Sequence, residues 1–412
     1  MGKRPARMRE AHAHVLAHGR AMDMVQLNGC TSAEEMLDAI ADAAVERRVV
    51  LAHGTRPEAW LEPGWPTLER LDHASPEASV AAWCFDYHAI MLNSRALEST
   101  GVGIDTPDPK GGQIGRRPDG SLTGVLYEAA VGMAWGKLEP TGIDEDALAR
   151  AIEDLAEHGF THVHDLKAQP GLGEALAATS TGSIEFTLYP LVQDLPEVLK
   201  RRRDWETDRV RLGGGKIFVD GTLNSRTAWM LHPFADGRTE HPAGMQLMSD
   251  RQIEDAMRLC VGEGLQLAAH AIGDAAVRAV LDAAERVRAP RGSVRIEHAE
   301  LIDEADVPRF AELGVIASVQ PCHLLYDIEA LRRACPDRLD RVLPLRELID
   351  SGLTPGRDLL FGSDTPIVRP DPEDSILAAT NRGRSDMALA EGIAPDQAIS
   401  EAEAWACFDA DA

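Results

Sequence analysis

The sequence has no long apolar run and no closely spaced cysteine pair, and it has few basic residues relative to acidic ones. No apolar stretch approaches the roughly 18 residues that a membrane-spanning helix needs, so we expect no membrane span. Lys and Arg number 42 against 67 Asp and Glu, which gives a net charge of −25. Such a surface repels phosphate backbones and anionic membranes, so nucleic acid and membranes are not expected partners.

The six cysteines form no CxxC motif, and the N-terminal residues MGKRPARMRE lack the apolar core of a signal peptide. Both absences favour a reducing, cytoplasmic location. The apolar share of 44% is ordinary for a soluble globular protein.

A repeating pattern is present instead. From about residue 250, amphipathic helices that end at glycine alternate with short apolar runs that end in a polar residue, which is typical of βα units. The expected strands are 161–164, 184–191, 216–219, 265–269, 294–297, 315–319 and 359–362, with helices such as 144–158, 250–260 and 274–288 between them. Seven or eight such units predict an α/β fold that closes into a parallel (β/α)8 TIM barrel.

Residues 51–142 break this rhythm and are rich in Pro, Gly and Trp. We interpret the chain as one barrel over 1–412, with 51–142 inserted after the first strand and lying over the active-site mouth. Before the insertion, Ser32 and Glu35 predict a capping box for a helix that runs to about Arg48.

His12 and His14 are two residues apart, so on a strand both imidazoles emerge on one face and can meet one ion. A second HxH, at His162 and His164, shows that this spacing alone is not specific. The more informative residues follow predicted strands, where barrel enzymes place their catalytic groups. They are His270, His298 and Asp364.

Lys216 begins a predicted strand and shares a face with Asp220. Inside a barrel its amine must be paired, deprotonated or modified. Imidazole and oxygen donors together predict a divalent ion, Zn²⁺ or similar, that activates water and polarises a substrate carbonyl. Asp364 would take the proton of that water and pass it to a leaving amine.

These residues lie in a series of motifs that resembles the amidohydrolase superfamily, and within it the family 3 members related to N-substituted formamide deformylase. The matching segments run in order along the chain: His12 to Gly19; Asp86, His88, Asn93, Ala96 and Leu97; Gly124, Leu126 and Glu128; KIFVDGTLNSRTA (216–228); AHAIGD (269–274); RIEHAE (295–300); SVQP (318–321); and GSDTP (362–366).

The resemblance implies a role for each matched position. His12 and His14 would bind a buried metal, His270 and His298 a more exposed one, and Asp364 would be both ligand and acid/base. Lys216 would be carboxylated and bridge two metals, although a site with one metal and an unmodified lysine also occurs in the superfamily. The expected substrate-pocket residues are His88, Glu128, Arg226 and His323, with Arg226 available to hold a substrate oxygen.

The chain departs from the family at both ends. Relatives carry a β-sandwich built from segments before the HxH and after the last barrel strand, and we expect most of it to be missing here. Arg7, Arg9 and Glu10 do not supply the apolar side chains of a buried first strand. Either that strand begins at Ala11, or another partner covers it, or the chain is truncated or degenerate with a poorly formed site. Barrel surface left uncovered would favour a homo-oligomer.

The sequence is compatible with three functions. The first is hydrolysis of a C–N bond in a small amide or an N-acyl or N-formyl compound by metal-activated water. The second is deamination, or hydrolysis of an ester or cyclic amide, at the same site. The third is a catalytically silent barrel that serves binding or regulation.

Overall fold

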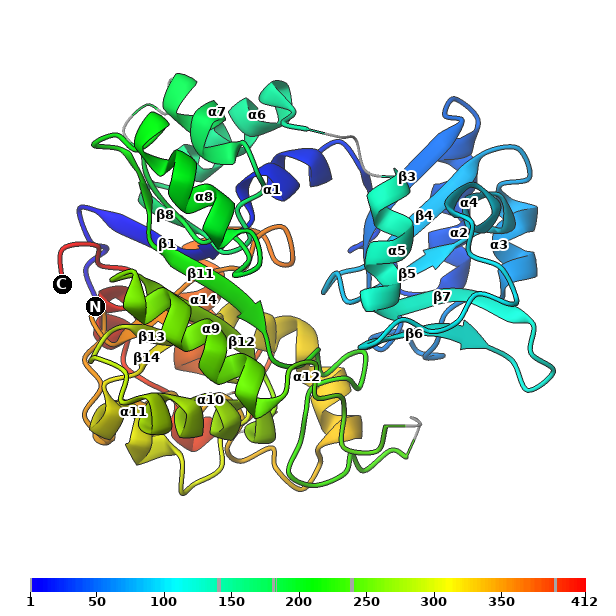
Figure 1. The fold of residues 1–412 in the computed structure, drawn as a ribbon. Coiled ribbons are helices and arrows are strands. Elements are labelled where there is room, and N and C mark those ends of the chain that lie inside the picture. The colour runs from blue at the N-terminus through cyan, green and yellow to red at the C-terminus, as the bar shows by residue number, and fades with distance from the viewer. Residues whose placement is uncertain (1, 139–141, 180–181, 183, 238–240, 389–390) are drawn as a thin grey trace. The chain divides into compact units, whose positions relative to one another are not determined.

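The structure is a computed structural model that describes residues 2–138, 142–179, 182, 184–237, 241–388 and 391–412. The chain divides into two compact units (Figure 1). Unit 1 comprises Met1–Gly19 and Gly142–Ala412, and unit 2 comprises Arg20–Thr141. In the described parts of the chain, no helix has both the length and the apolar character of a membrane span.

Unit 1 is an α/β structure whose paired strands are all parallel. One sheet has the order β1 (Met8–Ala13), β8 (Phe160–Asp165), β9 (Glu185–Leu188) and β10 (Val210–Leu212). The other runs in chain order through β11 (Gly214–Phe218), β12 (Gln266–Ala271), β13 (Val294–His298), β14 (Ile316–Val319) and β15 (Leu359–Phe361). The expected alternation of strands with helices is therefore present.

Two isolated β-bridges join the first sheet to the second. Leu191 pairs with Lys216 in parallel fashion, and the backbone N–H of Lys216 donates to the carbonyl of Pro190 at 2.8 Å. Ala13 pairs in the same way with Thr365, which follows β15. Only Gly213 separates β10 from β11.

Helices connect these strands. In Figure 1, α9 (Asp250–Gly262) lies along β12, and α10 (Asp274–Val287) lies along β12 and β13. The helix α9 begins at a capping box formed by Ser249 and Gln252, as expected for a helix that must satisfy its first N–H groups. The helices of unit 1 are α6 (Glu145–Glu157), α7 (Leu172–Ala178), α8 (Leu195–Arg201), α9 (Asp250–Gly262), α10 (Asp274–Val287), α11 (Val307–Leu313), α12 (Leu324–Ala334), α13 (Leu345–Asp350), α14 (Pro372–Asn381) and α15 (Glu401–Ala406). Short 3₁₀ helices are η1 (Arg202–Asp204), η2 (Pro321–His323) and η4 (Pro395–Gln397), and α1 (Val15–Ala21) begins in this unit.

The first strand, β1, begins at Met8 and is therefore longer than a strand that begins at Ala11. Met8 forms an antiparallel bridge with Asp409, and the N–H of Arg9 donates to the carbonyl of Phe408 at 2.7 Å. The guanidinium of Arg9 donates to the carbonyl of Asp409 at 2.9 Å. Backbone groups of Phe408 and Asp409 thus stabilise this strand, although its charged residues are not typical of a buried first strand.

Unit 2 is built on one mixed sheet, in the order β2 (Val25–Gln26), β3 (Val49–Thr55), β4 (Ser79–Cys84), β5 (Ala89–Leu92), β7 (Leu122–Glu128) and β6 (Gly112–Arg116). Its helices are α2 (Ala33–Ala44), α3 (Leu68–Ala74), α4 (Ser94–Thr100) and α5 (Ala129–Leu138). Successive residues of β4 alternate between two buried apolar clusters, with Val80 in one and Ala81 in the other. Both faces of the sheet are therefore covered.

This unit begins at Arg20, earlier in the sequence than the insertion boundary placed at residue 51. The reason is strand pairing, because Val25 and Gln26 of β2 pair with Ala52 and His53 of β3 and so join the preceding segment to the same sheet. Ser32 caps α2 as expected by accepting from the N–H of Glu35. The helix ends at Ala44 rather than near Arg48.

Candidate metal centre

Four of the residues expected to bind metal meet at the carboxyl ends of strands in unit 1. His12 lies near the end of β1 and His14 follows the strand, while His298 is the last residue of β13. Asp364 lies three residues beyond β15. Parallel strands bring their carboxyl ends to one edge, which explains why residues so distant in sequence converge.

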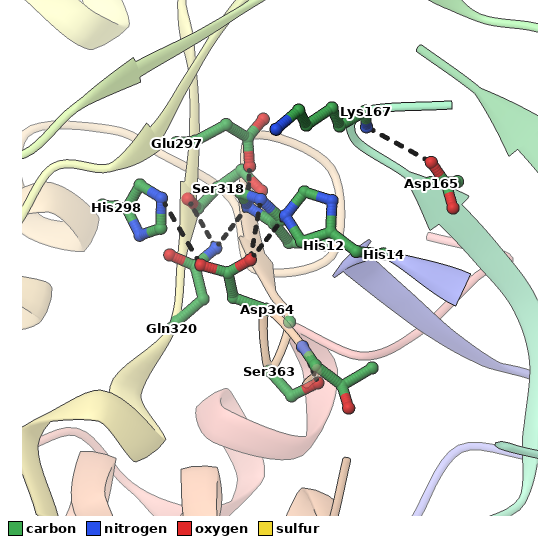
Figure 2. Close-up of polar contacts among 12 residues, drawn as sticks. His12, His14, Asp165, Lys167, Glu297, His298, Ser318, Gln320, Ser363 and Asp364 are labelled. Atoms are coloured by element: carbon green, nitrogen blue, oxygen red, sulfur yellow. Dashed lines mark hydrogen bonds and ion pairs between the residues drawn. The ribbon is translucent and has the colours of Figure 1, made fainter. Parts of the chain in front are cut away.

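The carboxylate of Asp364 lies among three imidazoles (Figure 2). Its Oδ1 is 2.9 Å from Nε2 of His14 and 3.3 Å from Nε2 of His12, and its Oδ2 is 3.8 Å from Nε2 of His298. His12, His298 and Asp364 are buried, and they offer ligand atoms that all lie within 4.8 Å of one another. This donor set suits a divalent ion such as Zn²⁺.

The backbone holds Asp364 in an uncommon conformation. Its φ angle is 61°, in the left-handed region that a residue with a side chain rarely occupies. The N–H of Asp364 donates to the carbonyl of His12 at 2.7 Å, and the N–H of His14 donates to the carbonyl of Thr365 at 2.9 Å. Strained residues of this kind concentrate at functional sites.

A buried carboxylate sets the orientation of His12. Oε2 of Glu297 is 2.9 Å from Nδ1 of His12, and because a carboxylate only accepts, Nδ1 carries the proton and Nε2 presents its lone pair to the site. Burial lowers the pKa of His12 to about 4 despite the nearby carboxylates, so the ring is neutral near pH 7. A neutral imidazole is the form that binds metal.

Arg295 keeps Glu297 ionised. Burial alone would raise the pKa of Glu297, but the guanidinium of Arg295 and the ring of His12 hold it well below its usual range. Arg295 donates to both oxygens of Glu297 and also to the carbonyl of Ala11 at 2.7 Å and Oγ of Ser318 at 2.7 Å. This network ties β1, β13 and β14 together beneath the candidate ligands.

Glu10 forms a second buried link. Its Oε1 accepts from the N–H groups of His12 and Ser363, both at 2.9 Å. Burial raises the pKa of Glu10 to about 8. A side chain that seemed out of place on a first strand therefore connects the His12 backbone to the loop that carries Asp364.

Lys216 lies on β11 with its amine buried and, among the described residues, without a hydrogen-bond partner. Burial lowers its pKa to about 8, although Glu297 and Asp364 oppose the shift. Nζ lies 5.1 Å from the centre of the Phe218 ring. An orphaned buried amine near two carboxylates fits a lysine that is modified or that faces an ion.

His270 is close to this group but oriented differently. Its ring centre is 4.5 Å from that of His298, while its Nε2 lies 3.2 Å from the carbonyl of Gly221 and 3.7 Å from Oδ1 of Asp220. The three-ligand groups found among the described residues do not include His270. Of the second HxH, His164 receives a hydrogen bond from Arg295 at 2.8 Å and lies outside those groups too.

The expected substrate-pocket residues belong to different units of the chain. His88 and Glu128 form a pair within unit 2, with Nδ1 and Oε2 2.7 Å apart. In unit 1, Nε of Arg226 donates to Asp236 at 2.8 Å. His323 is the one beside the candidate ligands, since its ring centre is 5.8 Å from that of His298.

Several residues in the site had no role assigned from the sequence. Glu300 joins His298 and His323 in a second group that could hold a metal ion. Its position two residues after His298 in the RIEHAE segment is a signal that could have identified it. The others are Glu10, Arg295, Glu297 and Gln320, whose contacts depend on the tertiary structure.

An α/β fold with buried imidazoles and a carboxylate at strand ends is the arrangement of metal-dependent hydrolases. The chain belongs to the amidohydrolase family, whose sequence profile matches residues 8–408. It is 30% identical to the YtcJ protein of Bacillus subtilis (strain 168) over 395 residues, which cover 91% of this chain and 73% of that protein.

Two further relatives are informative. N-substituted formamide deformylase of Arthrobacter pascens is 29% identical over 362 residues, covering 82% of this chain and 65% of that enzyme. A crystal structure of an uncharacterized metal-dependent hydrolase from Pyrococcus horikoshii superimposes with a TM-score of 0.74 at 25% identity, covering 97% of this chain and 78% of that one.

Proposed function

We propose that this protein is a metal-dependent hydrolase that cleaves the C–N bond of a small amide or an N-acyl compound, N-formyl compounds included. The observation that carries the proposal is the buried group of His12, His298 and Asp364, with His14 beside it. Membership of the amidohydrolase family supports hydrolysis, and the deformylase relative supports an amide-type bond.

The scaffold we propose is one (β/α)8 barrel. Two bridges between the sheets support it: Leu191, just beyond β9, pairs with Lys216 on β11, and Ala13 on β1 pairs with Thr365, which follows β15. With β10 and β11 counted as one strand, the strands of unit 1 follow one another in the order β1, β8, β9, β10–β11, β12, β13, β14 and β15, and the second bridge returns to β1.

The ligands we propose are His12, His14, His298 and Asp364, completed by His270 and by Lys216 in its carboxylated form. Their imidazole and oxygen donors suit Zn²⁺. The buried amine of Lys216 has no hydrogen-bond partner within the described part of the chain, which supports a role for that residue toward the ion. A divalent ion bound there would polarise a substrate carbonyl and lower the pKa of adjacent water.

Asp364 is proposed to move the proton. Oδ1 lies closest to His12 and His14, and Oδ2, 3.8 Å from Nε2 of His298, would take a proton from the attacking water and deliver it to the amine nitrogen. A C–O bond forms, the C–N bond breaks, and the products are a carboxylic acid and an amine. We propose His88, Glu128, Arg226 and His323 as substrate contacts.

The test combines metal analysis with chromogenic substrates. Purified protein is assayed for bound metal and for turnover of 4-nitroformanilide, 4-nitroacetanilide and 4-nitrophenyl acetate. We expect metal-dependent release of 4-nitroaniline, and Asp364→Asn should lower the rate by about 100-fold or more. The matched control is Asp350→Asn at an exposed ion pair on α13, which should leave the rate unchanged.

Other outcomes would redirect the proposal. Turnover of the ester alone would show that a different bond is cleaved, and ammonia released from a heterocyclic amine would indicate deamination. Protein without bound metal, with activity indifferent to Asp364→Asn, would contradict the proposal and favour a catalytically silent barrel.

A further inference from the structure

The residue after Asp364 is a buried threonine whose three polar groups are all hydrogen-bonded. The N–H of Thr365 donates to Oγ of Ser363 at 3.1 Å, and its carbonyl accepts from the N–H of His14 at 2.9 Å. Its hydroxyl oxygen lies 2.9 Å from Nδ1 of His18. Thr365 is fully buried, so water does not replace these partners. One residue therefore links two candidate ligands, Asp364 through the peptide bond and His14 through a hydrogen bond.

A carboxylate on α6 orients the ring of His18. Nε2 of His18 lies 2.7 Å from Oδ2 of Asp154, and because a carboxylate only accepts, Nε2 carries a proton. In the neutral ring, Nδ1 is then the acceptor for the hydroxyl proton of Thr365. The side chain of His18 is 10% exposed and that of Asp154 is 22% exposed. A line of hydrogen bonds thus runs inward from Asp154 to the residue beside Asp364.

Close packing of α1 against α6 fixes the position of His18. A Cβ on Gly19, the next residue, would lie 1.8 Å from the carbonyl oxygen of Ala147 on α6, so only glycine allows this approach. At the other end of α1, the N–H of Val15 donates to Oδ2 of Asp165 at 2.8 Å. Because both ends of this short helix are held, the His18 ring has little freedom to move away from Thr365.

The conformation of Asp364 gives these contacts a purpose. Its φ angle of 61° is unfavourable for a residue with a side chain, so its neighbours must hold it in place. We propose that His18 is a positioning residue that acts through the hydroxyl of Thr365 to orient Asp364 toward the bound ion. Asp154 fixes the ring of His18 for this role. The inference rests on the proposed function, because it requires an ion at Asp364.

Zinc affinity of the full-length protein, measured by competition with a chromophoric chelator, tests the inference. Thr365→Val removes the hydroxyl but keeps the shape of the side chain, and His18→Phe removes its acceptor. Each should raise the Kd for zinc by roughly tenfold, the lower end of the effect of losing a ligand's own hydrogen-bond partner. The double variant should bind zinc within about twofold of the weaker single variant, because all three lose the same contact.

Conservative variants and a matched control separate this contact from general damage. Thr365→Ser keeps the hydroxyl, and the amide oxygen of His18→Asn can accept in place of Nδ1, so both should bind zinc more tightly than Thr365→Val and His18→Phe. Thr179→Val, at the C-terminal end of α7, loses a hydroxyl bond to the carbonyl of Ala175 and should bind zinc as wild type does.

Turnover of 4-nitroformanilide at saturating zinc gives a second measurement. Thr365→Val should lower kcat by about tenfold and leave KM within about twofold, because the proposed role of Asp364 is to move the proton. Urea unfolding of the metal-free variants reports any loss of stability separately. Variants that lose stability but keep the zinc Kd and the kcat of wild type would overturn the inference while the proposed function stands.

The remaining outcomes are also decisive. Losses of zinc affinity that add in the double variant would show that His18 does not act through Thr365, and the inference would be wrong. Wild-type protein that binds no zinc would contradict both the inference and the proposed function. If the zinc affinities change as expected but no amide is hydrolysed, the positioning role is supported and only the proposed reaction fails.

Discussion

Replacement of Glu297 by Gln tests whether a buried carboxylate prepares His12 to bind metal. The carboxylate lies 2.9 Å from the His12 Nδ1 proton donor and accepts from two nitrogens of Arg295. Gln has nearly the same shape but only one acceptor oxygen. Either His12 or Arg295 must therefore face an amide N–H in the variant.

Two effects of different size follow. A metal-binding histidine that loses its orienting partner typically loses about 10–100-fold in metal affinity, or about 1.4–2.7 kcal/mol. Breaking a buried ion pair costs about 3–5 kcal/mol in stability. Arg295 keeps the carbonyl of Ala11 and Oγ of Ser318 as acceptors, so we expect a smaller loss of about 2–3 kcal/mol.

The assay is Zn²⁺ affinity by competition with a chromophoric chelator, alongside urea unfolding of the metal-free protein. Glu34→Gln is the control, because Glu34 pairs with Arg70 at 2.7 Å on the exposed surface of unit 2. The control should leave zinc affinity unchanged. A folded Glu297→Gln protein with zinc affinity within twofold of wild type would refute the orienting role.

Two further predictions concern stability. Asp220 is fully buried and accepts from the N–H groups of Ile272 at 3.0 Å, Gly273 at 2.8 Å and Trp229 at 2.9 Å. Because Asp220→Ala leaves these three donors without an acceptor, it should lower the free energy of unfolding in urea by about 3–5 kcal/mol. A loss below about 1 kcal/mol would contradict this prediction. Glu10 has a folded pKa of about 8 against an ordinary value of 4.5, so between these pH values the folded state retains a proton that the unfolded state has released. The contribution of Glu10 to stability is thus lost as pH rises from 4.5 to 8, and Glu10→Gln should become more stable relative to wild type over that window in metal-free unfolding. A difference between the two proteins that does not vary with pH would show that Glu10 is not protonated in the fold.

The alternation of strands and helices could be predicted from the sequence because it depends on local patterns. His298 and Asp364 follow apolar runs, and that position alone placed them at the strand ends where they meet His12 and His14. The same local reasoning failed for β1, because its charged residues are satisfied by chain segments far away in the sequence. Arg9, for example, bonds to the carbonyl of Asp409.

The extent of unit 2 and the hydrogen-bond network of Arg295 and Glu297 could not be predicted from the sequence, because both depend on contacts between distant segments. Pairing of β2 with β3 joins the segment before residue 51 to unit 2, and no local pattern reports which strands pair. Glu297 lies beside a predicted ligand in sequence, but its function toward His12 depends on contact between β13 and β1 across the site. The orientation of His270 likewise depends on the carbonyl of Gly221 in another loop.

The central claim is that His12, His298 and Asp364, with His14, hold a divalent ion. An anomalous difference map at the zinc absorption edge, from crystals of zinc-loaded protein, tests it most directly. We predict a strong peak within bonding distance of Nε2 of His12 and the carboxylate of Asp364. Zinc found only at surface side chains, with no peak among these residues, would contradict the account.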